Sequence, residues 1–110
     1  MGKPAEERVR EVCAYVQAHL AEGIAVADIA RACGLNASYL NTCFRAQTGE
    51  SVSAFIRRTK IAHAQQLLTG TEHSLAEICA MLGYFDQSHF SRAFKAVTGM
   101  TPGSYRALHG

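Results

Sequence analysis

One stretch of this chain occurs twice, as VADIARACG at residues 26–34 and as LAEICAMLG at residues 75–83. A second pair follows the first, with SYLNTCFRAQTG at 38–49 matched by SHFSRAFKAVTG at 88–99. The first pair is offset by 49 residues and the second by 50, so the second copy has one extra residue in its turn. Each copy reads as a short helix, a glycine-containing turn and a second helix. The sequence therefore predicts a duplicated helix-turn-helix, over 26–49 and over 75–99.

The turns of both copies carry residues that suit this motif. Gly34 and Gly83 follow the first helix, and glycine readily adopts the left-handed conformation that ends a helix. Asn36 and Asp86 precede the second helix, where a side-chain oxygen can accept from free backbone N–H groups. We therefore expect both second helices to begin with a side-chain cap.

The first helices of the two copies are expected to start differently. Ser74 and Glu77 have the spacing of a capping box, in which each side chain accepts from the other residue's backbone N–H. Ala25 stands at the matching position of the first copy and has no side-chain oxygen. The first copy is therefore predicted to be the more weakly capped.

Two further helices are predicted outside the repeats. The segment 4–22 has proline and acidic residues at its start and apolar residues at three- and four-residue steps, and Gly23 is expected to end it. The long helix between the repeats has an apolar stripe that changes direction, with one cluster over 52–59 and another over 61–68. We expect its first half to be buried in one lobe and its second half in the other.

The predicted fold is all-α, with about seven helices in two lobes that form one domain, 1–110. Lobe one covers 5–50, the linker helix 51–69 and lobe two 70–108. A helix of about eighteen residues spans about 27 Å at ~1.5 Å per residue. Because one turn of B-DNA is about 34 Å, such a linker suits two reading helices in successive major grooves.

Each second helix divides into an apolar and a polar face. The positions expected to face the core are Leu40, Cys43 and Phe44 in the first copy and Phe90, Ala93, Phe94 and Val97 in the second. The polar stripes consist of Ser38, Asn41, Thr42 and Arg45, and of Ser88, Ser91, Arg92 and Lys95, with Gln87 and His89 on the flanks. A solvated polar face is the ordinary explanation for any surface helix. Small polar and basic residues on both copies of a duplicated unit nevertheless favour contact with DNA.

Charge is distributed unevenly along the chain. The net charge is +2, but residues 1–50 carry five basic and six acidic groups, whereas residues 51–110 carry six basic and three acidic groups. A basic C-terminal half is compatible with a polyanionic partner and is also found in ordinary domains. With 48% hydrophobic residues the chain is not expected to be disordered.

The four cysteines, at 13, 33, 43 and 79, form no C-x-x-C pair and lie among apolar residues. They are interpreted as reduced core cysteines of a cytoplasmic protein, with a disulfide or a zinc site as the alternatives. No segment has the ~18 apolar residues of a membrane span, and the N-terminus at 1–4 does not read as a signal peptide. We expect no metal, no cofactor and no membrane partner.

The segment GYFDQSHFSRAFKAVTGMTPGSYR at 83–106 resembles the signature of the AraC/XylS family of bacterial transcription regulators. The similarity continues upstream through Lys60-Ile61, Ala64 and Leu67-Leu68 and covers about residues 5–108. It implies a seven-helix, two-lobed DNA-binding domain whose recognition helices both enter the major groove. It also implies a role in activating, sometimes repressing, promoters, with RNA polymerase as a partner.

The resemblance also implies which side chains face DNA. Base-contacting positions fall on Ser38, Asn41 and Thr42 in the first recognition helix and on Gln87, Ser88, His89, Ser91 and Arg92 in the second. Arg45 and Lys95 are expected near the phosphate backbone. Arginine can donate to guanine with both arms of its guanidinium, and asparagine or glutamine can pair with adenine. For Arg92 the alternatives are a phosphate contact or an intramolecular pair; for His89, packing on the flank of the helix; for Asn41, a merely solvated side chain.

The sequence departs from the family pattern at three positions. Thr42 stands where arginine is usual and aligns with Arg92, so lobe one is expected to read fewer bases. Lys60 replaces a usual arginine, which is expected to weaken a forked ion pair near the linker. Cys79 replaces a small residue. The effector-binding or dimerisation domain of many family members is not found in these residues, so the chain is either a single-domain regulator or an excised piece.

Two other classes of function were weighed against a DNA-binding regulator. A protein-interaction module prefers a central aromatic or aliphatic anchor, which neither polar stripe contains. An enzyme is not favoured, because Ser88 and His89 are helical neighbours that diverge by ~100° and the chain has no nucleophile-elbow glycine pattern. No catalytic residue is therefore predicted.

Overall fold

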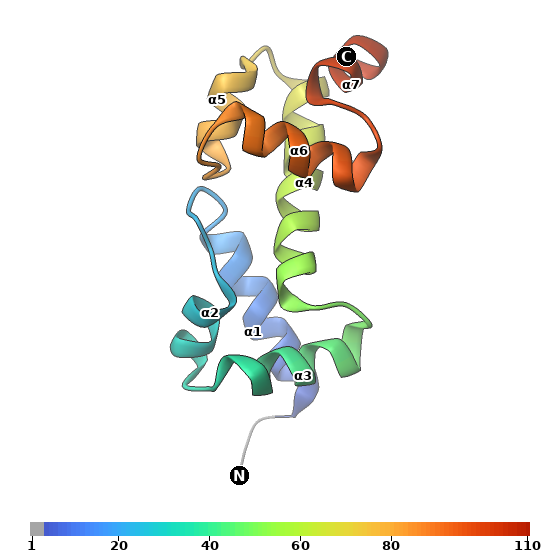
Figure 1. The fold of residues 1–110 in the computed structure, drawn as a ribbon. Helices are drawn as coiled ribbons and strands as arrows, with labels where there is room; N and C mark the ends of the chain where they lie inside the picture. The colour runs from blue at the N-terminus through green and yellow to red at the C-terminus, as the bar shows by residue number, and fades with distance from the viewer. Residues whose placement is uncertain (1–3) are drawn as a thin grey trace. The chain divides into compact units, whose positions relative to one another are not determined.

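The computed structural model describes residues 4–110, so the part of the signal-peptide expectation that concerns residues 1–3 lies outside the described residues. Within 4–110 the chain forms seven α-helices and no strand, which confirms the predicted all-α fold (Figure 1). The helices are α1 (Ala5–Ala18), α2 (Val26–Cys33), α3 (Ala37–Thr48), α4 (Val52–Gly70), α5 (Leu75–Met81), α6 (Gln87–Thr98) and α7 (Pro102–His109).

The helices belong to two compact units. The first unit consists of the chain up to His19 together with Ile24–Ile56, and the second consists of Leu20–Gly23 together with Arg57–Gly110. The long helix α4 is therefore shared: its first turns belong to the first unit and the remainder to the second.

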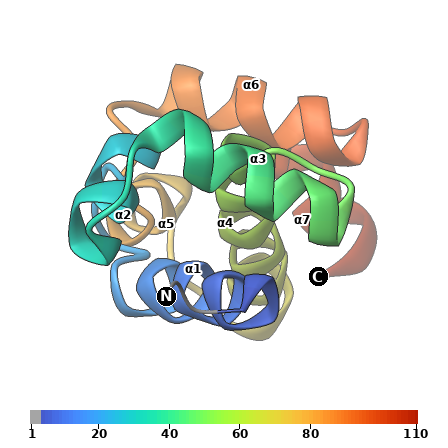
Figure 2. The same cartoon turned by 90° about the horizontal axis from the view of Figure 1, so that it is seen from below.

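In the first unit α1, α2 and α3 pack against one another, as Figure 2 shows from below. The start of α4 joins this unit, and the ring of Phe55 lies 5.3 Å from that of Phe44. The buried apolar residues of the unit are Val12, Val16, Ile29, Ala30, Leu40, Phe44, Val52 and Ile56. The predicted inward positions Leu40 and Phe44 are confirmed, whereas Cys43 is only half-buried.

In the second unit α4, α5 and α6 enclose the core, and α7 packs on α6 (Figure 1). The core residues are Ile61, Ala64, Leu68, Ile78, Cys79, Leu82, Phe90 and Phe94. Each fully buried phenylalanine stabilises the fold by about 1.5–3 kcal/mol. The prediction that Val97 faces inward is wrong: its side chain is 42% exposed, because it lies past the end of the contact between α6 and this core.

The buried residues of α4 follow the predicted change of direction. Val52 and Ile56 are buried in the first unit, while Ile61, Ala64 and Leu68 are buried in the second. A single helix therefore contributes buried residues to two cores.

The helix starts and turns largely follow the predicted chemistry. Gly34 (φ +69°) and Gly83 (φ +71°) are left-handed, as expected. The Asn36 side chain accepts from two backbone N–H groups of α3, and the Asp86 side chain accepts from the N–H of His89 in α6 at 2.7 Å. Both second helices thus begin with the predicted caps.

The first helices also start as predicted. At α5 the hydroxyl of Ser74 accepts from the Glu77 N–H and the Glu77 carboxylate accepts from the Ser74 N–H, each at 3.0 Å, which completes the capping box. These hydrogen bonds hold the pKa of Glu77 below its ordinary value. At α2 only one half of this arrangement exists, because Ala25 has no side-chain acceptor while Asp28 accepts from the Ala25 N–H at 2.9 Å.

The duplication includes the hydrogen bonds at the ends of α3 and α6. The hydroxyl of Thr48 donates to the backbone carbonyl of Phe44 and lies 3.3 Å from the backbone carbonyl of Glu50. Fifty residues later, the hydroxyl of Thr98 makes the same pair of contacts with Phe94 and Met100. Gly49 and Gly99 then close both helices in the left-handed conformation.

The first helix is shorter than predicted. α1 ends at Ala18 rather than at Glu22, and the following residues 20–23 belong to the second unit. The residues after the helix contact the second unit instead, where the carbonyl of Glu22 accepts from the Lys60 ammonium at 2.6 Å. Gly23 follows this contact instead of ending the helix.

Lys60 holds this turn through main-chain atoms. Its side chain is 5% exposed, and its ammonium donates to the carbonyls of Glu22 and Leu82, both at 2.6 Å. The ammonium also lies 5.5 Å from the centre of the Tyr84 ring. Burial lowers the pKa of Lys60, and the Glu22 carboxylate partly offsets this. A lysine therefore serves here without a planar fork, because its acceptors are two carbonyls from separate segments.

Within residues 4–110 no disulfide joins any of the four cysteines. Cys79 is buried and its pKa is raised, mainly by that burial. The other three are half-buried. Their interpretation as reduced cysteines packed among apolar residues agrees with these positions.

Candidate nucleic-acid interface

The predicted polar stripe of α3 lies on the side of the helix opposite its buried residues. Ser38, Thr42 and Arg45 are exposed, whereas Leu40 and Phe44 are buried. The hydroxyl of Thr42 donates to the carbonyl of Ser38 at 2.9 Å, so in this rotamer its proton stays within the helix. The stripe thus offers one cation and small polar groups.

The stripe of α6 is richer in charge. Gln87, Ser88, His89, Arg92 and Lys95 are exposed, and Ser91 is partly buried. The His89 ring stands edge-on to the Tyr84 ring at a centroid distance of 5.7 Å. This contact agrees with packing on the flank of the helix and leaves the imidazole accessible.

The basic side chains of both stripes are unpaired. Among residues 4–110, Arg45, Arg92 and Lys95 make no ion pair and no side-chain hydrogen bond, whereas exposed Arg31 is 3.5 Å from Asp28. The intramolecular pair that was an alternative for Arg92 is therefore not formed. An exposed, unpaired guanidinium is free to bind a phosphate or a guanine edge without breaking a contact.

Asn41 has a role inside the fold that the sequence did not reveal. Its side-chain oxygen accepts from the backbone N–H of Val52 at 2.9 Å, at the first residue of α4. The equivalent pair in the second copy is Ser91 and Pro102, and proline has no N–H to satisfy. The two copies therefore differ at the start of the following helix. In the first copy an asparagine oxygen accepts from the backbone N–H, and in the second copy proline leaves no N–H to be satisfied.

We expect Asn41→Ala to lower the free energy of unfolding by about 1 kcal/mol, the usual value of a lost helix cap. The N–H of Val52, which is fully buried, loses its acceptor in this variant. The matched Ser91→Ala variant removes no such bond and should leave stability nearly unchanged. Urea denaturation of both variants checks this, and equal losses would contradict it.

The sequence analysis did not single out two exposed aromatic residues that lie close in sequence to the predicted stripes. Tyr39, 56% exposed, follows Ser38 on α3 and stands at the repeat position of His89. Phe85, 91% exposed, directly precedes the capping residue Asp86. The 50-residue offset could have indicated Tyr39, since it aligns with the predicted base-contacting residue His89, whereas Phe85 has no counterpart in the first copy.

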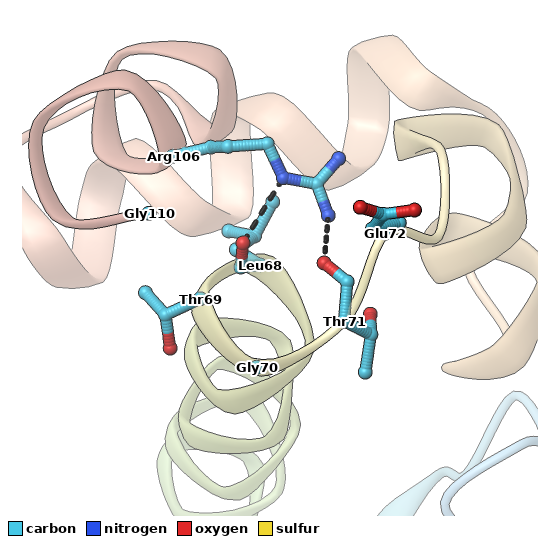
Figure 3. Close-up of a pocket in the computed structure, with 7 residues that line it drawn as sticks. All are labelled: Leu68, Thr69, Gly70, Thr71, Glu72, Arg106 and Gly110. Atoms are coloured by element: carbon cyan, nitrogen blue, oxygen red, sulfur yellow. Dashed lines mark hydrogen bonds between the residues drawn. The ribbon is translucent and has the colours of Figure 1, made fainter.

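The surface also contains a hollow of about 500 Å³ at the end of α4, lined by Leu68, Thr69, Gly70, Thr71, Glu72, Arg106 and Gly110 (Figure 3). The guanidinium of Arg106, which lines this hollow, is bound within the fold. It donates to the backbone carbonyl of Leu68 at 3.0 Å and lies 3.4 Å from the backbone carbonyl of Thr71. Arg106 thereby caps the C-terminal end of α4. The hollow is therefore interpreted as part of the packing of α7 on α4.

Residues 4–110 contain neither a cluster of metal ligands nor a membrane-spanning helix. No group of three or more histidine, cysteine, aspartate or glutamate side chains is arranged to hold a metal ion. No helix in this range combines the length and apolar character needed to cross a membrane.

Comparison with known proteins assigns the fold to a family. Residues 9–108 match a family described as a helix-turn-helix domain, which covers nearly the whole chain. The chain belongs to the AraC-type helix-turn-helix family. The sequence resemblance and the seven-helix fold are both confirmed by this match.

AraC-type regulators are the most similar sequences among the relatives compared. The arabinose operon regulatory protein of Escherichia coli K12 is 38% identical over 105 residues, which are 94% of this chain and 36% of that protein. The transcriptional activator RhaR of Yersinia pseudotuberculosis is 35% identical over 103 residues, with the same coverage of both chains. The present chain thus spans about a third of the length of these relatives, which are named as regulators and not as enzymes.

Solved AraC-type domains have the same fold. The C-terminal domain of AraT, a response regulator from Geobacillus stearothermophilus, matches with a TM-score of 0.88 and 28% identity over 92% of this chain and 84% of that domain. The DNA-binding domain of the transcription factor AdpA, solved with a target DNA, matches with a TM-score of 0.84 and 25% identity. That match covers 91% of this chain and 90% of the AdpA chain.

Proposed function

We propose that this chain is a sequence-specific double-stranded DNA-binding transcription regulator. In this proposal α3 and α6 are the recognition helices and enter successive major grooves of an asymmetric promoter site. The observation that carries it is the pair of capped second helices whose outward cations have no partner among residues 4–110. The AdpA domain bound to its target DNA supports the same function for this fold.

The outward side chains have the chemistry of base readout. Arg92 can donate to both acceptors of guanine, and Gln87 can pair with adenine. Asn41 keeps only its amide N–H groups for DNA while its oxygen caps α4, so it is proposed to donate one hydrogen bond to a base or a phosphate. The proposed base contacts are Ser38, Tyr39, Asn41, Thr42, Gln87, Ser88, His89, Ser91 and Arg92, with Arg45 and Lys95 at phosphates.

The two helices are proposed to contribute unequally. α6 carries Arg92 and Lys95, whereas α3 has Thr42 at the position of Arg92 and a single cation, Arg45. A threonine hydroxyl discriminates less between bases than an arginine does. We therefore infer that the half-site read by α6 is the more stringent and that the whole site is not a palindrome.

Arg92→Ala is expected to weaken binding to the selected site by about 1–3 kcal/mol and to relax specificity at one base pair, because a bidentate arginine discriminates by that amount. Lys95→Ala is expected to weaken all duplexes alike, since a phosphate contact carries no sequence information. The duplex is obtained by selection from a randomised pool. Fluorescence anisotropy with matched and scrambled duplexes then gives the dissociation constants.

The comparison of the two variants decides the base-reading role. Equal losses on matched and scrambled duplexes for Arg92→Ala would rule out a base contact there. Failure of the unaltered chain to enrich any duplex would refute the proposed function itself. The enriched sequences would also give the separation of the half-sites, expected at about 10–10.5 base pairs.

The remaining attributes follow from relatives that are longer than this chain. Activation of promoters, contact with RNA polymerase and control by a separate effector or dimerisation domain are proposed on the names and lengths of those relatives. A regulator of bacterial DNA acts in the cytoplasm, which is the localisation we propose.

A further inference from the structure

The turn before α6 contains a residue without a counterpart in the first copy. After α2 the N–H of Leu35 donates to the carbonyl of Ala30 at 2.8 Å, and after α5 the N–H of Tyr84 donates to that of Cys79 at 3.1 Å. These bonds make Tyr84 the equivalent of Leu35. In the first copy the capping residue Asn36 follows at once, whereas Phe85 is inserted before Asp86.

The inserted side chain does not contribute to the core. Phe85 is 91% exposed, the most exposed of the large hydrophobic residues in the described chain. Burying a phenylalanine ring is strongly favourable, so the fold gains almost nothing from this one. A ring left in solvent at this position is therefore available to a partner.

Its neighbours hold the backbone of Phe85 in place. On one side the Tyr84 ring lies 5.2 Å from the ring of Phe90, which is fully buried. On the other side the Asp86 carboxylate accepts from the His89 N–H at 2.7 Å. Phe85 thus sits at a fixed point, directly before the capping residue Asp86 and two positions before Gln87, the first residue of α6.

We propose that Phe85 is a further specificity-determining residue, which packs against the 5-methyl group of a thymine at the edge of the half-site read by α6. This inference rests on the proposed function. In a helix-turn-helix the N-terminal residues of the recognition helix contact base edges. A phenyl ring offers no hydrogen bond, and the thymine methyl is the apolar group that bases present in the major groove.

Replacing thymine by deoxyuridine tests this contact, because it removes only the methyl group. Each thymine of the selected duplex is replaced in turn, and the dissociation constant is measured by fluorescence anisotropy. The unaltered chain should lose about fourfold in affinity at one thymine beside the α6 half-site, as expected for one buried methyl group. Phe85→Ala should bind the thymine duplex at least fourfold more weakly than the unaltered chain does. Replacing that thymine by deoxyuridine should then cause no additional loss of affinity in this variant.

A matched control is provided by Leu108→Ala, which removes another exposed apolar side chain, 68% exposed, on α7. This variant should keep both the affinity and the deoxyuridine response. Circular dichroism of both variants checks that the helices are intact.

Other outcomes would overturn the inference in distinguishable ways. The thymine contact is refuted if Phe85→Ala binds DNA as tightly as the unaltered chain, or if it responds to deoxyuridine at every thymine as the unaltered chain does. A selected half-site that contains no thymine would also refute it. In each case the proposed DNA binding itself is unaffected. A contact of Phe85 with another protein predicts the first of these results. If the unaltered chain binds no duplex, both the inference and the proposed function fail.

Discussion

Gly83→Ala is expected to lower the free energy of unfolding by about 3 kcal/mol or more. The left-handed conformation, φ +71°, costs a residue with a β-carbon about 1–2 kcal/mol. A β-carbon here would also lie 2.7 Å from the carbonyl carbon and oxygen of Glu22 and 2.8 Å from the carbonyl oxygen of Ala21. Because these are backbone atoms, the turn at 20–23 must move away from residue 83 within the second unit, which places the change among the large destabilising mutations.

Gly34→Ala is the matched control for this prediction. Gly34 has nearly the same conformation, φ +69°, but a β-carbon there would meet nothing within 4 Å. Its loss should therefore stay near 1 kcal/mol, the conformational cost alone. Urea denaturation of both variants measures the difference. Similar losses for the two glycines would show that the close approach at Gly83 contributes nothing to stability.

Lys60→Met is expected to cost about 3 kcal/mol. Methionine keeps the apolar stem but removes both 2.6 Å hydrogen bonds, which leaves the carbonyls of Glu22 and Leu82 without their donor. The bond to Leu82 is buried, whereas the bond to Glu22 is partly buried. Leaving the buried carbonyl of Leu82 unsatisfied costs about 1–3 kcal/mol, and the loss of a bond from a charged donor lies in the upper part of that range. Relief from burying the ammonium offsets part of this loss.

Lys60→Arg is the control, because it retains a cation with several donors and restores the residue usual in the family pattern. Its stability should remain close to that of the unaltered chain. Hydrogen exchange offers a local readout: in Lys60→Met the amides of the 20–23 turn should exchange faster, while those of α7 should not change. Unaltered stability and exchange in Lys60→Met would refute the role assigned to this side chain.

The pKa of Lys60 adds a pH signature. Because burial lowers the pKa of Lys60 below the ordinary 10.5, the unfolded chain binds more protons than the folded chain just below that pH. Folding stability due to this group therefore rises with pH in that window. The deficit of Lys60→Met relative to the unaltered chain should grow as pH approaches 10.5, provided that the neutral amine still donates to one carbonyl.

Most of the secondary structure could be predicted from local chemistry. The repeat of apolar positions, the glycines at 34 and 83 and the caps Asn36 and Asp86 each act over a few residues, so the sequence contains them completely. The end of α1 could not be predicted, because residues 20–23 leave the helix for contacts with Lys60 and Gly83, which are distant in sequence.

The candidate interface shows the same division. Outward positions on α3 and α6 follow from helical spacing alone, and the family resemblance names the same side chains. The capping role of Asn41 depends on Val52, eleven residues away, and on the direction in which α4 leaves the turn. Val97 was misplaced because a periodic pattern does not indicate how far a neighbouring core extends along the helix.

The sequence by itself determined which segments are helical, where they begin, and that two similar reading units exist, because hydrogen bonding and periodicity within a segment are local. Tertiary structure alone decided which polar groups are occupied inside the fold and which remain free for a ligand. Asn41 accepts from a backbone N–H of α4, and Lys60 donates to backbone carbonyls of other segments. Arg92 and Phe85, in contrast, are exposed to solvent. Such assignments depend on contacts between residues far apart in the chain, which no local pattern encodes.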